Sequence, residues 1–390
     1  MMNSLYSALP TTIFEVMSSL SRHYDAINLG QGFPDDPGPE DVRKIAAEHV
    51  LHGYNQYPSM LGLPELRQAI SVHYKKIYEC DYDPNTEILV TSGATEALAS
   101  ALFALIEPGD EVIIFQPAYD AYAPLVRRAG GKVKFVSLRP PHWEFSDADL
   151  AQAFSNKTRL VIFNNPMNPC GIVYSQAQVQ LLAKYCINYG VIAVCDEVWE
   201  HVIFDHLQHH PMHSIEGMRD LTVKIGSGGK IFSLTGWKVG WILASEKMMD
   251  SIKKAHQFFT FTTPPNLQSA IAYGLGKEMS YFTQMRQSFQ TSRDRLTSGL
   301  RKLNLSVLPS KGTYFLTVDL ATRTKMDDET FCKQLVSQAK VAAIPVSAFY
   351  EVNPVRSVVR FCFAKKDATL DMALERLHNI EHILNEAGQS

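Results

Sequence analysis

Short apolar runs alternate with helical stretches from residue 88 onward, and this alternation is the strongest constraint on the fold. Each run is continuously apolar instead of switching between apolar and polar residues. Continuous apolar strands separated by helices are typical of a mostly parallel sheet that is buried on both faces. The runs are Ile88–Thr91, Glu111–Phe115, Val133–Leu138, Leu160–Asn164, Val191–Cys195, Leu221–Ile225 and Val239–Ala244. We therefore predict an α/β fold in which helices sandwich a seven-stranded sheet.

The two ends of the chain predict a second, smaller α+β unit. Its strand candidates are Tyr314–Val318, Val341–Val346 and Val358–Phe363, and its helix candidates lie near Asp328–Ala339 and Ala368–Glu386. A long helical pattern from about residue 270 to residue 303 leads the chain into this unit. We therefore expect a large domain at residues 36–280 and a small domain made of residues 1–35 and 281–390.

Composition narrows the class of partner. With 390 residues, 46% of them hydrophobic, the chain is long enough to build both units. A net charge of −3 gives no basic footprint, so we do not expect nucleic acid as a partner. The six cysteines form no CxxC pair, and reduced core cysteine is the default interpretation. We see neither a signal peptide nor an apolar run of membrane length, so we expect a cytoplasmic protein with no membrane partner.

The segment that follows the apolar run at 221–225 carries the strongest chemical signal. Residues 226–230 read Gly-Ser-Gly-Gly-Lys and place a lone lysine, Lys230, in an otherwise apolar stretch. Burial lowers the pKa of a lysine, so that its neutral amine becomes a nucleophile. Ser227 and the backbone amides beside it suit a phosphate group, and Lys238 can add a positive charge. The alternative is a glycine-rich turn with an exposed lysine.

Two nucleotide-binding motifs fail in this chain. A P-loop requires a glycine five residues before its Gly-Lys pair and a Ser or Thr after it, but Lys224 and Ile231 stand there. The spacing Gly30-x-Gly32 suggests a dinucleotide fingerprint, but Asp35 occupies the third glycine position. Glycines in this arrangement instead allow the backbone to approach a ligand closely.

Polar residues also stand where other predicted strands end, which is where ligands bind in open α/β sheets. Gly93, Ala94 and Thr95 open a helix after the first strand, and the free amides at a helix start favour an anion. Asp196 follows another strand, where a buried carboxylate requires a partner. The alternatives are a plain cap at Ser92 for the first group, and a structural salt bridge or helix cap for Asp196.

Arg360 lies in the middle of a predicted strand, among valines and phenylalanines. A guanidinium in such surroundings must find an anion, and its planar fork fits a carboxylate bidentately. That carboxylate is either part of a ligand or a structural Asp or Glu.

Three motifs occur together and in a familiar order. They are the lysine stretch at 226–230, the Asn-Pro-Met-Asn-Pro-Cys-Gly turn at 165–171 and the Asp-Glu-Val segment at 196–198. Their order and spacing resemble those of the fold-type I, PLP-dependent aminotransferases of class I. The resemblance is strongest to the branch that contains kynurenine, glutamine and methionine aminotransferases. It implies an enzyme that holds pyridoxal 5′-phosphate (PLP) on Lys230 as a Schiff base and moves an amino group from an L-amino acid to a 2-oxo acid in two half-reactions.

The resemblance also implies roles at the cofactor. Lys230 and Asp196 would be catalytic, the amine as general base and the carboxylate as partner of the pyridinium nitrogen. Asn168 would contact the phenolic oxygen of PLP, and Tyr119 would stack on its ring, with core packing as the alternative for Tyr119. The phosphate would be held by Gly93, Ala94, Thr95, Ser227 and Lys238.

The substrate side of the site follows from the same resemblance. Arg360 would bind the substrate carboxylate, together with Asn168 and the backbone at Gly32, and Phe14 would line the substrate pocket. Tyr57 would reach the cofactor phosphate of the neighbouring subunit, which implies a homodimer. The amino acid remains open among methionine, glutamine, phenylalanine and kynurenine.

Trp199 departs from the family pattern, which usually has at this place a tyrosine that hydrogen-bonds the phenolic oxygen of the cofactor. Indole donates one hydrogen bond but neither accepts one nor titrates.

Two alternative functions remain open beside the aminotransferase. One is a PLP-dependent cysteine-S-conjugate β-lyase, which uses the same site, and the other is a non-catalytic PLP-binding regulatory protein.

A group of histidines has a spacing that could hold a metal ion. No helix pattern or carboxylate scaffold organises this group, so we expect an exposed loop and no metal site. Its members are His206, His209, His210 and His213.

Overall fold

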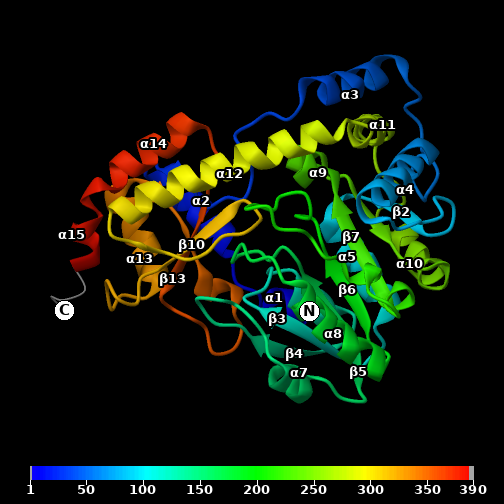
Figure 1. Ribbon diagram of the computed structural model, residues 1–390, viewed down its shortest axis with the longest axis horizontal. Helices are drawn as coiled ribbons and strands as arrows, with labels where there is room; N and C mark the ends of the chain where they lie inside the picture. The colour runs from blue at the N-terminus through cyan, green and yellow to red at the C-terminus, as the bar shows by residue number, and fades with distance from the viewer. Residues whose placement is uncertain (1, 386–390) are drawn as a thin grey trace.

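The computed structural model describes residues 2–385 and has the predicted α/β architecture around a seven-stranded sheet (Figure 1). The strand order across this sheet is β2-β8-β7-β6-β5-β3-β4. All seven predicted strands are present, as β2 (Ile88–Thr91), β3 (Glu111–Gln116), β4 (Lys132–Ser137), β5 (Thr158–Asn164), β6 (Ile192–Asp196), β7 (Thr222–Ser227) and β8 (Gly240–Leu243). Neighbouring strands are parallel except at β8, which is antiparallel to both β2 and β7. The prediction of a mostly parallel sheet is therefore confirmed.

Strand direction gathers the polar strand ends at one edge. Asn164 at the end of β5 lies opposite Asp196 at the end of β6. Ser227 ends the adjacent strand β7 and pairs with Gly240, the first residue of the reversed strand β8. Because the carboxyl ends of parallel strands meet at one edge, these four residues border the same side of the sheet.

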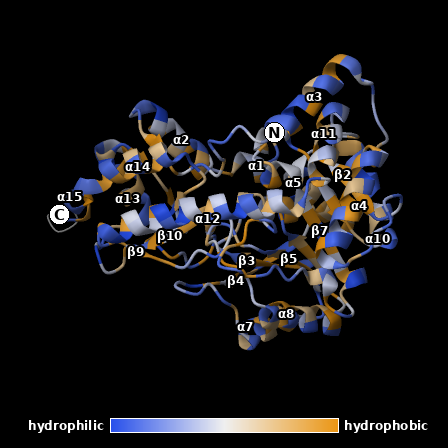
Figure 2. Cartoon of the chain, turned by 45° about the horizontal axis from the view of Figure 1, so that its top comes forward, coloured by the Kyte–Doolittle hydropathy of each residue, from blue (hydrophilic) through white to orange (hydrophobic). Residues whose placement is uncertain are grey.

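Helices cover both faces of the sheet. Helices α5 (Gly93–Leu105) and α10 (Glu246–Phe259) pack together on one face, while α7 (Asp147–Ala153) and α8 (Gln176–Tyr189) cover the other. A third apolar cluster joins α4 (Pro64–Tyr78) to β2 and β8. The remaining helices of this part are α3 (Glu40–His52), α6 (Tyr122–Arg128), α9 (Gly228–Ile231) and α11 (Pro265–Leu275). Figure 2 shows the same layering, with orange strands inside and blue, hydrophilic residues on the outer helices.

The smaller unit is built on a four-stranded antiparallel sheet with the order β12-β13-β10-β9. Its strands are β9 (Ser306–Val307), β10 (Phe315–Asp319), β12 (Ile344–Pro345) and β13 (Val358–Cys362), and its helices are α2 (Ile13–His23), α13 (Asp328–Gln334), α14 (Asp367–Arg376) and α15 (Ile380–Asn385). The N-terminal strand β1 (Ile27–Asn28) pairs in parallel with β11 (Val341–Ala342). The single strand predicted at Val341–Val346 is therefore wrong, because its two halves join different sheets.

Two predicted helices are also interrupted. The pattern from residue 270 to 303 is not one helix: α11 ends at Leu275 with Gly276 as its cap, and α12 (Met279–Lys302) begins after an extended Glu278. The extended backbone of Glu278 interrupts the helical hydrogen bonds and redirects the chain. Helix α12 then runs from the large unit to the small one (Figure 1). The helix predicted at residues 368–386 is split by a 3₁₀ turn at Leu377–Asn379, and Glu386 lies outside the described residues.

Candidate functional site

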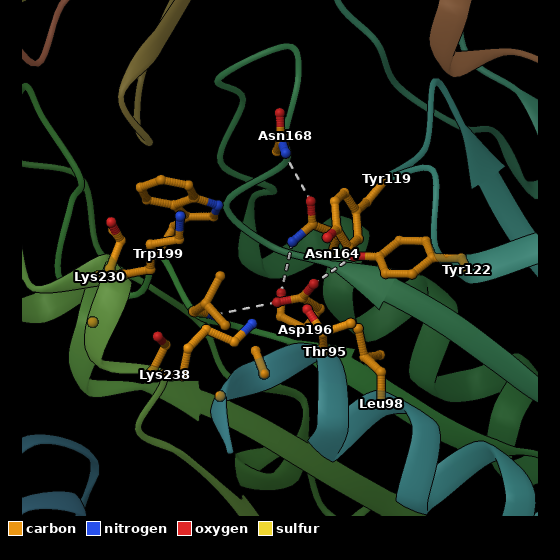
Figure 3. Close-up of a pocket in the computed structure, with 16 residues that line it drawn as sticks. Thr95, Leu98, Tyr119, Tyr122, Asn164, Asn168, Asp196, Trp199, Lys230 and Lys238 are labelled. Atoms are coloured by element: carbon orange, nitrogen blue, oxygen red, sulfur yellow. Dashed lines mark hydrogen bonds between the residues drawn. The ribbon is translucent and has the colours of Figure 1, made fainter. Parts of the chain in front are cut away.

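A cavity of about 210 Å³ opens at the carboxyl edge of the large sheet, between β5, β6 and β7 and the start of α5. It is lined by side chains from separate elements, several of which point toward a common centre (Figure 3). The structure brings together there ten of the residues singled out in the sequence: Gly93, Ala94, Thr95, Tyr119, Asn168, Asp196, Trp199, Ser227, Lys230 and Lys238.

Lys230 reaches this cavity from α9, a single helical turn that starts directly after β7. Burial lowers the pKa of Lys230 to about 8, although the nearby carboxylate of Asp196 opposes the shift. No hydrogen bond or ion pair engages the Lys230 amine among the described residues. Instead the amine lies 4.6 Å from the ring centroid of Trp199. The lysine is thus a half-buried amine that no acceptor within the described part of the chain engages.

Asp196 stands at the floor of the cavity, at the end of β6. Its Oδ2 accepts a hydrogen bond of 2.5 Å from the hydroxyl of Tyr122, and its backbone oxygen accepts one of 2.8 Å from the amide of Asn164. Burial raises the pKa of Asp196, and the Tyr122 hydrogen bond counteracts part of that rise. The backbone amide of Val198 lies 3.5 Å from Oδ1, so this second oxygen keeps capacity for a stronger partner.

Gly93 and Lys238 shape the opposite end of the cavity. Gly93 opens α5 with a positive φ of 78°, and a Cβ built on it would lie 3.2 Å from Cε of Lys238 and 3.4 Å from its Nζ. A side chain would therefore be strained and would crowd the ammonium. The glycine leaves the first amides of α5 facing a cation and the Ser227 hydroxyl, which is a suitable site for an anion.

Arg360 lies on β13 of the small unit and is 1% exposed. Its guanidinium donates 2.8 Å hydrogen bonds to Oδ1 of Asn168 and to the backbone oxygen of Gly30. Its Nε is buried without a hydrogen-bond partner, and no carboxylate of residues 2–385 forms an ion pair with it. Burial lowers the pKa of Arg360 to about 10. The structural Asp or Glu partner considered from the sequence is therefore not found among these residues.

Aromatic rings enclose this arginine. The ring of Phe315 lies 3.9 Å from the guanidinium carbon, and those of Phe349 and Phe14 lie 5.2 Å and 5.4 Å from it. Gly32 is near as well, because a Cβ there would lie 2.5 Å from the Phe315 ring. Phe14 and Gly32, both expected at the substrate end, thus lie close to the arginine.

Tyr57 does not line the cavity of its own chain. It stands on the loop between α3 and α4, is 80% exposed and touches the ring of Phe261 edge-on. Its expected contact with the cofactor of a neighbouring subunit stays a prediction.

Sequence reasoning missed several residues that act around the cavity. Tyr122 and Asn164 hold Asp196, and Gly30 holds Arg360. Asn164 closes an apolar strand, as Asp196 does, and this shared position is the signal that could have identified it. Tyr122 follows Tyr119 by three residues near the start of α6, but nothing in the sequence relates it to Asp196.

The histidine loop is a correction. It was expected to be exposed, and His206 is exposed, but the side chain of His209 is 2% exposed and His213 is 3% exposed. The physical reason is Glu197, whose buried carboxylate accepts a 2.8 Å hydrogen bond from His209 and draws the loop inward. Glu197, Glu200 and His209 offer ligand atoms within 4.8 Å of one another, but the ammonium of Lys224 contacts both carboxylates.

The cavity offers groups that match the three reactive parts of PLP. Lys230 is an amine for the aldehyde, Asp196 is a buried carboxylate for the ring nitrogen, and the Gly93–Lys238 end suits the phosphate. Tyr119 adds an aromatic ring to the wall, and burial raises the pKa of its hydroxyl. The donor set therefore fits this cofactor.

Comparison with known proteins supplies the family. The model of the family "Aminotransferase class I and II" matches residues 24–377. Methionine aminotransferase of Escherichia coli (strain K12) is 40% identical over 95% of this chain and 96% of its own length. Kynurenine–oxoglutarate transaminase 1 of Homo sapiens is 35% identical over 92% of this chain and 93% of its own. The solved structure of N-succinyldiaminopimelate aminotransferase from Mycobacterium tuberculosis has a TM-score of 0.94 at 38% identity and covers 97% of this chain and 100% of that one. The chain belongs to the class I and II aminotransferases, in the branch expected from its sequence, and is a PLP-dependent enzyme that transfers amino groups between small amino acids and oxo acids.

Proposed function

We propose that Lys230 holds PLP in this cavity and serves as the proton carrier of the transfer. The observation that carries the proposal is the half-buried Lys230 amine, which shares one cavity with Asp196 and has a pKa of about 8. An amine with such a pKa is available as a base close to neutral pH, whereas an ordinary lysine is protonated there.

The cofactor, when bound, stores the amino group and withdraws electrons from the α-carbon. Lys230 would take the α-proton and return it two bonds away, on the carbon at the other side of the amino nitrogen. Asp196 would keep a proton on the ring nitrogen, and the hydroxyl of Tyr122 would keep the carboxylate ionised and oriented. Lys238, Ser227 and the amides at Gly93 would hold the phosphate.

Arg360 would bind the α-carboxylate of the substrate. Its present acceptors, Asn168 and Gly30, are neutral, so a carboxylate is a stronger partner for the guanidinium than either. The rings of Phe14, Phe315 and Phe349 exclude water around it and strengthen the interaction.

We propose methionine and other large apolar or aromatic amino acids as amino donors. The aromatic rings of Tyr119 and Trp199 in the cavity, and of Phe14 near Arg360, support this class, as do the names of the methionine and kynurenine relatives. The cations that line the cavity are Lys230 and Lys238, both assigned to the cofactor. A substrate with a second carboxylate, such as that of the N-succinyldiaminopimelate relative, would lack a dedicated partner among these lining residues.

The active form is proposed to be a homodimer. Large apolar side chains stand exposed around the loop that carries Tyr57, and this is the face on which a second copy would bury apolar surface. They are Leu51, Tyr54, Tyr57, Phe258 and Phe261.

We also propose a cytoplasmic location. All six cysteines are unpaired thiols, and a reducing compartment keeps thiols in this state.

The decisive experiment loads the purified protein with PLP and adds L-methionine without an oxo acid. The visible absorbance of bound cofactor should fall and a pyridoxamine-like band should grow, with one equivalent of oxo acid released. The K230A variant should show neither change. Release of pyruvate and ammonia from a cysteine conjugate would instead favour the β-lyase, and an unchanged spectrum with a panel of amino acids would contradict the proposal.

A further inference from the structure

Trp199 packs its indole face on the amine of Lys230. The distance from Nζ to the ring centroid is 4.6 Å, and the tryptophan is 3% exposed. Figure 3 shows the Lys230 amine directly against the indole ring, on the side of the cavity away from Tyr122. An aromatic face attracts an ammonium, and the attraction strengthens where water is excluded.

The indole is fixed in this position by two rings of the small unit. Tyr314 meets it edge-on at 4.5 Å between centroids, and Phe315 meets it edge-on at 5.7 Å. The hydroxyl of Tyr314 also donates a 2.7 Å hydrogen bond to the backbone oxygen of Lys230. One side chain therefore supports both the indole and the lysine, so the distance between them is set by the fold.

Other charges face the same amine. Asp196 favours the ammonium, whereas Arg360 and Lys238 disfavour it, and the thiol of Cys362 is the remaining titratable neighbour. Tyr314 faces the lysine as well, but its pKa is raised by burial, so its hydroxyl stays neutral. Within this set, Trp199 is the one aromatic face on the amine that carries no ionisable group.

We propose that Trp199 is a positioning residue that holds the Lys230 ammonium on its indole face and thereby sets the pH at which this amine becomes reactive. The proposal rests on the assignment of Lys230 as the cofactor-binding lysine. A tyrosine at this place would bring a hydroxyl that titrates, whereas the indole acts on the lysine at every pH. The reactive pH would thus depend on Asp196, the two cations and an uncharged ring.

The test measures how fast the cofactor-free protein captures pyridoxal, which lacks a phosphate, between pH 6 and pH 10. The capture rate rises as Lys230 loses its proton, and the midpoint of that rise is the readout. Removal of the aromatic face in W199L should lower the midpoint by about one pH unit. W199F keeps a weaker aromatic face, so its midpoint should fall by less.

Two controls separate the possible outcomes. Trp143 packs in a different apolar cluster, under α7 and α8, so W143F should leave the midpoint unchanged. K230M should capture no pyridoxal at this site; if it captures as the natural protein does, the assignment of Lys230 itself fails. A midpoint in W199L and W199F that equals that of the natural protein, or lies above it, would overturn the role of Trp199. If circular dichroism shows that W199L does not fold, the comparison of W199F with W143F decides.

Discussion

Two lysines stand six residues apart in this chain, one fully buried and one half-buried, and their surroundings are opposite. Lys224, on β7, contacts the carboxylates of both Glu197 and Glu200, and these contacts raise its pKa despite burial. Lys230, on α9, has no such partner, and burial lowers its pKa to about 8. Burial alone therefore does not make a lysine reactive. The number of carboxylates within contact distance decides whether the lysine keeps its proton or loses it more easily.

The carboxylates around Lys224 find their partners within the protein. Glu200 accepts a 2.5 Å hydrogen bond from Tyr74 and Glu197 accepts one of 2.8 Å from His209, in addition to their contacts with the lysine. The pKa of Glu200 is lowered to about 2, because the attraction of Lys224 outweighs burial. The candidate site instead leaves hydrogen-bonding capacity open at Asp196 in the cavity and at Arg360, which contacts the lining residue Asn168. The charges around Lys224 are paired with one another, whereas those of the candidate site remain available for a ligand.

The largest expected effect comes from breaking the internal pair. K224M leaves Glu197 and Glu200 buried without their cation and should lower the free energy of unfolding by about 3–5 kcal/mol at pH 7. Urea denaturation of the cofactor-free protein measures it. K44M is the matched control, since Lys44 pairs with Glu40 on the exposed face of α3, and it should change stability little.

The pH dependence sharpens this prediction. The folded-state pKa of both glutamates is depressed, so their contribution to stability is present above the ordinary glutamate pKa and is lost as pH falls toward the folded value. In K224M the lysine no longer opposes burial, so the pKa of both glutamates should rise above the ordinary value. The deficit should then shrink between pH 7 and pH 4, because the unpaired glutamates become protonated there. A deficit that is equal at the two pH values would argue for lost packing instead of lost charge pairing.

The same substitution at Lys230 should raise the free energy of unfolding at pH 7, whereas K224M lowers it. The unfolded state holds the Lys230 proton up to about pH 10.5, whereas the folded state releases it near 8, so this group makes stability rise with pH in that window. K230M removes the cost of a buried unpaired ammonium and should stabilise the cofactor-free protein by about 3 kcal/mol at pH 7. The advantage should largely vanish at pH 10.5. Destabilisation at pH 7 would refute the contrast between the two lysines.

A smaller effect is expected at the carboxylate of the cavity. Y122F removes the hydroxyl that donates to Asp196, so the pKa of Asp196 should rise further and its hold on the ring nitrogen should weaken. Loss of a hydrogen bond to a charged group costs about 1.5 kcal/mol, which corresponds to roughly tenfold weaker binding of PLP. Absorbance titration of the cofactor-free protein measures it. Y185F, which removes an exposed hydroxyl bonded to the Asp147 backbone, should bind PLP as the natural protein does.

The strands, and the residues that end them, were accessible from the sequence because both depend on local pattern. Seven apolar runs became seven strands, and Asp196 and Ser227 came to one edge as parallel pairing requires. The pattern failed where a partner distant in sequence decides the outcome. From the sequence, Lys224 served only to reject a P-loop and its ion pairs were not predicted, because the two carboxylates lie more than twenty residues earlier.

The histidines illustrate the same limit. Their loop was expected to be exposed because no helix pattern or carboxylate scaffold was recognised around it. The carboxylate that His209 contacts belongs to Glu197, 12 residues earlier, so no local pattern reveals it. Strand pairing in the small unit also depends on partners that are distant in sequence. Its apolar stretch at residues 341–346 reads as one strand, but the first half pairs with β1 near the N-terminus and the second half with β13.

The hydrogen bond from Arg360 to the backbone oxygen of Gly30 joins positions 330 residues apart. Closing so long a loop costs chain entropy, and contacts of this kind slow folding. During synthesis, the large sheet from β2 to β8 can form long before Arg360 leaves the ribosome. A nascent chain would thus have its lysine and its aspartate in place while the arginine was still missing. Competence to recognise an amino acid would be among the last properties that a newly made molecule acquires.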